Sequence, residues 1–413
     1  MRRSTSRIIV SHAGTLPRPP ELQELFAGGE ATRQAFEQAV PDAIKEVVRR
    51  QAEAGVDVVN DGEFDKRGIF IGYIRDRMSG FERRPELASQ PRDAGVTGRD
   101  RRDFPGFHAA GGGGFNVGAG QGTPPGSAAR GAGSGTSSAL AAVPGGFPAA
   151  DAGPFMVTGP LTYTGYDAVA TDIKRLKAAC EGLDVEPYLP AIAPGTIEHW
   201  LWRGEQFKSD EEFLFAIADV MHEEYKAITD AGVVLQIDDP DLPDGWQMYP
   251  DMTVPEYRKY AELRVDAINH ALRGIPEELV RLHVCWGSMH GPHRDDIALR
   301  DLIDLIFKVR AECYSIEAAN PRHEHEWNVF EDVKLPEGKS LMPGVVGHTS
   351  NTIEHPELVA QRLVRYANLV GRENVIAGTD CGLGNRVHAE IVWAKLEDMA
   401  KGAELATKEL WRR

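Results

Sequence analysis

The sequence lacks the features that would place the protein in a membrane or in an oxidising compartment. None of its apolar runs approaches the roughly 18 residues of a membrane-spanning helix. The start, MRRSTSRIIVSHAG, is basic, but no apolar core follows it, so we do not expect a signal peptide. Four cysteines in 413 residues are too few for a disulfide scaffold. We therefore expect a cytoplasmic protein.

Positive charge is also scarce. Lys and Arg total 46 against 62 for Asp and Glu, which leaves a net charge of −16. This balance argues against a nucleic acid or an anionic membrane as partner. Hydrophobic residues make up 42%, which is ordinary for a chain with a sizeable core. The length fits either two or three domains or one barrel of about 250 residues with additions.

One segment, Phe107–Ala150, differs in composition from the rest of the chain. It holds 13 Gly in 44 residues and one charged side chain, Arg130. Such a stretch buries too little apolar surface to offset the entropy lost on ordering. We interpret it as a mobile, low-complexity insertion within a single domain that spans residues 1–413. A linker between two domains and an active-site lid are the alternatives.

Short β-branched runs alternate with amphipathic stretches along the rest of the chain. The predicted strands are Arg7–His12, Val56–Asn60, Phe155–Gly159, Pro187–Ile192, Val233–Ile237, Arg281–Cys285, Tyr314–Glu317, Gly344–Val346 and Val375–Ala377. The predicted helices are Asp42–Ala54, Ala168–Cys180, Asp210–Ala231, Val254–Leu272, Asp296–Ala311, Pro356–Leu369 and His388–Leu405. In Asp296–Ala311 apolar residues recur at helical spacing, and Asp295 and Asp296 suit the positive end of the helix dipole.

This alternation predicts a parallel α/β protein, a (β/α)8 TIM barrel. Nine strands compete for eight places, so one is an extra strand or part of a hairpin. A doubly wound sheet is the alternative. We favour the barrel because polar clusters follow nearly every strand, and the carboxyl-end face of a barrel collects the active site.

Three predicted strands end in residues that bind soft metals. His283 and Cys285 are two apart on one strand, so their side chains project to the same face. The next strand ends at Glu317, and the last is followed by Cys381. Together these four would form one N/O/S2 tetrahedron suited to zinc. Each alone is more often a packing residue, as we expect for Cys180 and Cys313.

Carboxylates also follow two other predicted strands. Glu63 lies in NDGE (60–63) and Asp238 in QIDDP (236–240). Carboxylates in a barrel mouth can bind a substrate ammonium group or carry protons. A solvated loop or a helix cap is the alternative, and it fits Asp61 and Asp239 better than the other two.

Other candidates are weaker. The small loop around Gly14 and Thr15 lets backbone groups approach a ligand closely. Trp200 could stack on a flat heterocycle, although packing under a loop is the commoner role. His348, just after a strand, is the best candidate for a proton donor. The remaining histidines of this region, including His290, His293, His323 and His325, suggest no specific role.

Taken together, these residues resemble the catalytic barrel of cobalamin-independent methionine synthase and its stand-alone relatives. The resemblance rests on the HxC at His283–Cys285, the SIE at Ser315–Glu317 and the DCGL at Asp380–Leu383. The IDDP at Ile237–Pro240 and the GE at Gly62-Glu63 resemble further motifs of that family. Two motifs depart from it: WGSMHGPH follows the HxC, and GHTS surrounds His348.

The resemblance implies a TIM barrel whose zinc is held by His283, Cys285, Glu317 and Cys381. It implies that Glu63, Asp238 and the Gly14–Thr15 loop bind homocysteine, and that Trp200 stacks on the folate pterin. The implied reaction is that of 5-methyltetrahydropteroyltriglutamate–homocysteine S-methyltransferase, with methionine as product. Its partners would be a small thiol and a methyl donor.

Three other readings stay open. A related barrel opens epoxides with coenzyme M, but a sulfonate thiol would want Arg or Lys where Glu63 and Asp238 stand. A metal-free decarboxylase barrel of the uroporphyrinogen type would leave HxC, SIE and DCG without a role. A non-enzymatic zinc protein would explain the ligands but not the acidic residues at the same face.

Overall fold

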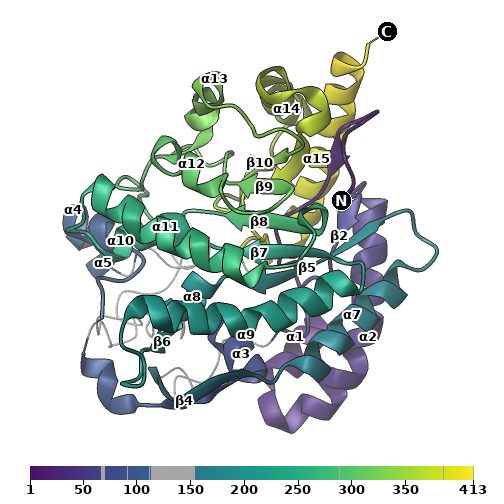
Figure 1. Ribbon diagram of the computed structural model, residues 1–413. Coiled ribbons are helices and arrows are strands. Elements are labelled where there is room, and N and C mark those ends of the chain that lie inside the picture. Colours follow the sequence, from purple (N-terminus) through teal and green to yellow (C-terminus); the bar gives the residue numbers. More distant parts are fainter. Residues whose placement is uncertain are drawn as a thin grey trace.

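Eight parallel strands form a nearly closed barrel at the centre of the molecule (Figure 1). The computed structural model describes residues 1–66, 70–90, 92–110, 112, 154–287, 289–384 and 386–412. Gly111 and residues 113–150 of the Gly-rich segment lie outside the described residues, so its role as an insertion stays a prediction. Among the described helices, none has the length and apolar character needed to cross a bilayer.

The barrel confirms the predicted fold class. The strand order is β1-β11-β10-β9-β8-β7-β5-β2, and a parallel bridge between Ser11 and Val58 joins the two ends. The strands are β1 (Ile9–Val10), β2 (Val58–Val59), β5 (Glu186–Ile192), β7 (Val234–Asp238), β8 (Val280–Val284), β9 (Cys313–Ile316), β10 (Ser340–Val346) and β11 (Ile376–Thr379). Because all eight are parallel, their carboxyl ends meet at one mouth.

Helices cover the outside of the barrel (Figure 1). The described helices are α1 (Pro20–Ala27), α2 (Arg33–Glu53), α3 (Phe70–Arg77), α4 (Gly98–Asp103), α5 (Pro105–Ala109), α7 (Tyr166–Cys180), α8 (Pro194–Trp200), α9 (Asp210–Asp230), α10 (Asp241–Met248), α11 (Val254–Ala271), α12 (Ile303–Ile306), α13 (Val329–Asp332), α14 (Pro356–Val370) and α15 (Ala389–Leu410). A side chain caps the start of α9, α11, α14 and α15. For example, α9 begins where the Ser209 side chain accepts from the Glu212 N–H.

The ninth predicted strand lies outside the barrel. It is β4 (Phe155–Tyr163), which pairs with β3 (Met78–Arg83) and β6 (Leu201–Trp202) in a separate three-stranded sheet. Eight of the nine predicted strands therefore supply the barrel, and the extra one supplies the side sheet. Neither β3 nor β6 has the β-branched run on which the prediction relied.

The predicted helix Asp296–Ala311 is wrong in most of its length. Only a short 3-10 turn at Leu299–Asp301 and the four residues of α12 are helical. The apolar residues that suggested one helical stripe are all buried, but the backbone between them is mostly turn and loop. Leu302 also leaves the helical region, with φ at −123°. Asp296 is not at the start of a helix. Its carboxylate instead contacts two histidines, His293 and His323.

The barrel interior is apolar at one end and polar beneath the mouth. Ile9, Val58, Val234 and Ile376, among others, form a small cluster inside the barrel. Above it Arg281, fully buried, donates to Gln236 Oε1 at 2.8 Å and to Ser11 Oγ at 2.9 Å. Its guanidinium lies over the Tyr188 ring, 4.1 Å from the ring centre. This layer gives the mouth a rigid, hydrogen-bonded floor.

Candidate functional site

Three of the four predicted metal ligands meet at the barrel mouth. His283 lies on β8, Cys285 follows its last residue, and Cys381 follows β11. One ligand atom from each lies within 4.8 Å of those of the other two. The two sulfur atoms are 3.9 Å apart. The HxC spacing works as predicted, because positions 283 and 285 point to the same side of one strand.

This arrangement fits a tetrahedral soft-metal site. With zinc–sulfur bonds of about 2.3 Å, two tetrahedral thiolates stand about 3.8 Å apart. His283 Nδ1 pairs with Ser315 Oγ at 2.9 Å, which leaves Nε2 for the metal and fixes the ring. Nε2 is buried and has no hydrogen-bond partner among the described residues. A buried imidazole nitrogen between two thiols is the donor set that zinc prefers.

A hydrogen bond between the two cysteines shifts their pKa values in opposite directions. The Cys285 thiol donates to the Cys381 sulfur, which raises the pKa of Cys285 and lowers the pKa of Cys381 well below its ordinary value. Arg386 and His283 add to the lowering at Cys381. The hydrogen bond thus favours the thiolate at Cys381 over the thiolate at Cys285, and a bound cation would favour the thiolate at both.

Glu317, the predicted fourth ligand, lies in an adjacent group with His348 and Asp380. The three offer ligand atoms within 4.8 Å of one another, and all are buried. Glu317 accepts from the Trp286 N–H at 3.0 Å and from Asn320 Nδ2 at 3.0 Å. Both nitrogens of the His348 ring are without a hydrogen-bond partner among the described residues. The structure therefore puts Glu317 beside the three other ligands rather than among them.

In this second group, the pKa shifts favour a proton on Asp380 rather than on His348. Burial lowers the pKa of His348 to about 3, so its ring is neutral at pH 7. Burial, with the nearby Glu317, raises the pKa of Asp380 to about 8. Asp380 Oδ1 accepts the N–H groups of Ala318 and Ala319 at 2.7 Å, which leaves Oδ2 to hold the proton. His348 can pass a proton but does not store one.

The two predicted acids Glu63 and Asp238 border the same mouth, after β2 and at the end of β7. Glu63 has a positive φ of 59°, which is strained for a residue with a side chain. Thr15 Oγ1 donates to Glu63 Oε1 at 3.1 Å, and a Cβ on Gly14 would stand 2.8 Å from that oxygen. The predicted Gly14–Thr15 loop therefore needs glycine to let it approach the carboxylate. Lys66 Nζ lies 3.9 Å from Glu63 Oε2 and also donates to the Pro190 carbonyl.

The pKa of Asp238 is raised, which favours its neutral form. Burial raises its pKa to about 7, and the neighbouring Glu63 adds to the shift. Gln236 Nε2 donates to Asp238 Oδ1 at 2.7 Å and holds the carboxylate in place. A cation placed beside Asp238 would favour the charged form of its carboxyl. Asp61 and Asp239 instead accept hydrogen bonds from the backbone N–H groups of Glu63 and Leu242. The second bond is the cap role we expected, but both side chains are buried rather than in a solvated loop.

Two further expectations concern packing. Trp200 ends α8 half-buried and packs against the core, so its contact with a ligand stays a prediction. Cys313 is buried on β9 inside the barrel, and Cys180 ends α7, both away from the ligand group. Their positions agree with the packing role expected for them.

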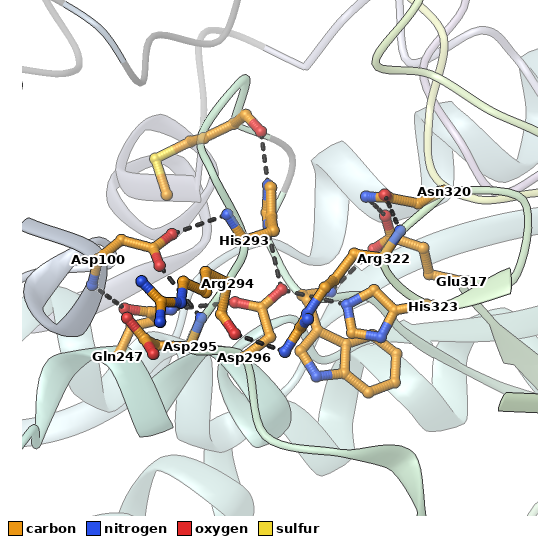
Figure 2. A network of polar contacts seen from close by, with 12 residues as sticks. Asp100, Gln247, His293, Arg294, Asp295, Asp296, Glu317, Asn320, Arg322 and His323 are labelled. Carbon is orange, nitrogen blue, oxygen red and sulfur yellow. Dashed lines mark hydrogen bonds and ion pairs between the residues drawn. The ribbon is translucent and has the colours of Figure 1, made fainter. Parts of the chain in front are cut away.

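Sequence reasoning missed a buried polar network beside the ligands (Figure 2). Its centre is Asp296, whose Oδ2 is 2.8 Å from His293 Nδ1 and 3.1 Å from His323 Nε2. Burial opposes a charge on His323, but Asp296 and Glu326 outweigh it and raise the pKa of His323 to about 9. The signal was present in WGSMHGPH, the stretch after the HxC that departs from the family pattern, and in the aspartates that follow it.

The chain is similar to proteins of one family. The profile described as the cobalamin-independent synthase catalytic domain matches residues 192–405. A methionine synthase of Sulfolobus acidocaldarius is 24% identical over 96% of this chain and 91% of its own length. One from Thermococcus kodakarensis is 28% identical over 54% of this chain and 58% of its own. The structure of a cobalamin-independent methionine synthase from a Shewanella species superposes with a TM-score of 0.66, at 19% identity, covering 98% of this chain and 99% of that one.

Proposed function

Because the chain belongs to the family of the cobalamin-independent synthase catalytic domain, we propose that it is a zinc-dependent methyltransferase acting on the thiol of homocysteine. The donor is a methylated folate or a simpler methyl compound, and the product is methionine. The observation that carries this proposal is the position of His283, Cys285 and Cys381 at the same barrel mouth as Glu63 and Asp238. The Shewanella relative was solved with selenomethionine, an analogue of that product.

The donor set supports chemistry at sulfur. His283, Cys285 and Cys381 would hold the zinc, and Glu317, next to them, would supply a fourth ligand when no substrate is bound. When bound, the zinc lowers the pKa of the substrate thiol so that it reacts as a thiolate. Two cysteine ligands also keep the site rich in negative charge. Such a site suits attack by sulfur better than activation of water, for which catalytic zinc usually has mostly histidine ligands.

The acidic pair supports an amino-acid thiol. Glu63 and Asp238 would accept hydrogen bonds from the substrate ammonium group, and this contact would orient the thiol toward the metal side of the mouth. A thiol that carries a sulfonate would instead meet two carboxylates. Lys66 is the cation beside them, and its ammonium group is already tied to Glu63 and to the Pro190 carbonyl. The pair therefore favours homocysteine over coenzyme M.

The second group supports proton delivery. A folate donor leaves as an amine whose nitrogen must gain a proton as the methyl–nitrogen bond breaks. Asp380 Oδ2 would store that proton at neutral pH, and His348 would relay it toward the mouth. Both side chains are buried, so the proton would not exchange freely with solvent.

The test measures metal, product and donor together. Zinc-loaded protein is incubated with homocysteine and either methyltetrahydrofolate or a methylsulfonium donor, and methionine is quantified by mass spectrometry. Parallel reactions replace homocysteine with 2-mercaptoethanesulfonate. Methionine formation that needs zinc supports the proposal. Alkylation of the sulfonate thiol alone, or equal activity without metal, would refute it.

A further inference from the structure

The peptide group between Cys285 and Trp286 links two parts of the metal site. Its N–H donates to Glu317 Oε2 at 3.0 Å, while the residue before it supplies a ligand sulfur. The position of this one peptide therefore sets both the Cys285 ligand and the carboxylate beside it. Whatever holds Trp286 also holds that geometry.

The Trp286 side chain is clamped from two sides. Its indole Nε1 donates to the Ile297 carbonyl at 2.7 Å. Its ring stacks on His323, with ring centres 4.1 Å apart and planes inclined by 26°. Trp286 is 2% exposed, so no solvent separates the two rings. A stacked, hydrogen-bonded tryptophan has little rotational freedom.

His323 is itself fixed at both ring nitrogens. Nδ1 meets Glu326 Oε2 at 2.8 Å, and Nε2 meets Asp296 Oδ2 at 3.1 Å. Glu326 is anchored in turn by the Leu299 N–H at 2.7 Å. Two carboxylates on one imidazole hold the ring plane against rotation.

Asp296 connects this clamp to a segment outside the barrel (Figure 2). It accepts from Gln247 Nε2 at 3.0 Å and meets His293 Nδ1 at 2.8 Å. His293 has a strained φ of 53°, and its N–H donates to Asp100 Oδ2 on α4 at 2.8 Å. Buried charges and backbone strain are costly, and apolar packing would serve the fold as well. Their presence next to the ligands indicates a positioning role.

We propose that His323 and Asp296 are positioning residues that, through Trp286, hold the Glu317 carboxylate beside His283, Cys285 and Cys381, where it can leave the metal when a substrate thiol binds. The proposal rests on the proposed function, because it takes these three residues as the metal ligands. Because the Trp286 N–H holds Glu317 Oε2, the carboxylate would bind the metal weakly and give way to the substrate thiol. If the clamp loosens, the carboxylate competes with the thiol for the metal.

The test uses the full-length protein loaded with Co2+, whose visible spectrum reports the ligands. His323→Ala removes the ring under Trp286, and Asp296→Asn keeps the volume but removes the charge. His222→Ala is the matched control, since His222 makes one bond to the Ala271 carbonyl on the outer helices. Each protein is titrated with homocysteine while the d–d and thiolate charge-transfer bands are recorded.

We expect one cobalt and intact thiolate bands in all three variants. In His323→Ala the d–d bands should shift and the thiol should bind about tenfold more weakly, a typical cost for residues behind the ligands. In Asp296→Asn the d–d bands and the thiol affinity should change in the same direction by less. This variant tests the inference if His323→Ala does not fold. Wild-type d–d bands and thiol affinity in both variants would overturn the inference. Failure of the wild-type protein to bind cobalt through thiolates would instead overturn the proposed function.

Discussion

The sulfur atoms of Cys285 and Cys381 lie 3.9 Å apart although 96 residues separate them in the sequence. Their strands, β8 and β11, are not neighbours, because β9 and β10 lie between them in the barrel. The two side chains therefore reach each other across the mouth. The closure of the sheet, rather than any local motif, brings the two sulfurs of the candidate metal site together.

Replacing one of these sulfurs should remove the metal. We expect Cys381→Ser to lose zinc, because a serine hydroxyl is a poor ligand for a soft site and remains protonated at neutral pH. Elemental analysis should find about one zinc per chain in the wild type and far less in the variant. Cys180→Ser, at the end of α7, is the control and should keep its zinc. Equal zinc in both variants would contradict the assignment.

The acidic pair should determine affinity for the amino group of the substrate. We expect Glu63→Gln to raise KM for homocysteine by about 10- to 100-fold, because a charge-assisted hydrogen bond is lost, with a smaller effect on kcat. The comparison substrate is 4-mercaptobutyrate, which keeps the thiol and carboxylate but lacks the ammonium group. Wild type and variant should use it equally poorly. A variant that is impaired equally with both thiols would show that Glu63 does not bind the ammonium group.

We expect Arg18 to hold the loop that carries Glu63 in place without contacting the substrate. Its guanidinium donates to the carbonyls of Glu63, Phe64 and Lys66 at 3.0–3.1 Å and holds the loop in its strained form. A lysine cannot reproduce this fork, so Arg18→Lys should cost about 1–3 kcal/mol of stability and raise KM for homocysteine. Urea unfolding and steady-state kinetics measure the two effects. Arg33→Lys, a surface residue paired with Glu37, should change neither.

The sequence predicted the meeting of His283, Cys285 and Cys381 better than their surroundings, for a physical reason. His283 and Cys285 share one strand, and the period of two directly predicts that they point to one side. Glu63 and Asp238 were expected at the mouth because they follow predicted strands of the barrel. The network around Asp296 follows no period, because its members come from α4, α10 and the loops after β8 and β9. Helical spacing even suggested a helix there, since an irregular segment that packs on the core and an amphipathic helix both need frequent apolar residues.

The charge on His323 should make stability depend on pH. Its pKa is raised from about 6.5 to about 9 in the folded chain. The stabilisation is therefore fully present below pH 6.5 and is lost as the pH rises through 9. We expect the unfolding free energy of the metal-free wild type to exceed that of His323→Gln at pH 6.5. This difference should decrease by on the order of 3 kcal/mol at most as the pH rises from 6.5 to 10. An unchanged margin would mean that His323 is not charged.

The last prediction separates proton transfer from binding at His348. A methylfolate donor needs a proton on its departing nitrogen, whereas a methylsulfonium donor leaves as a neutral thioether and needs none. His348→Gln keeps a polar side chain of similar size but cannot relay a proton between two ring nitrogens. We expect kcat with methyltetrahydrofolate to fall about 100-fold, and kcat with the sulfonium donor to fall much less.

Stopped-flow or steady-state rates with both donors at saturating homocysteine make this comparison. His325→Gln is the control, since that histidine lies on the exposed side of the same region. Zinc content must match in all three proteins, because His348 lies beside the ligands. Equal losses with both donors would show that His348 shapes the site rather than moving the proton. Asp380 would then remain as the acid, with its pKa of about 8 and its free Oδ2.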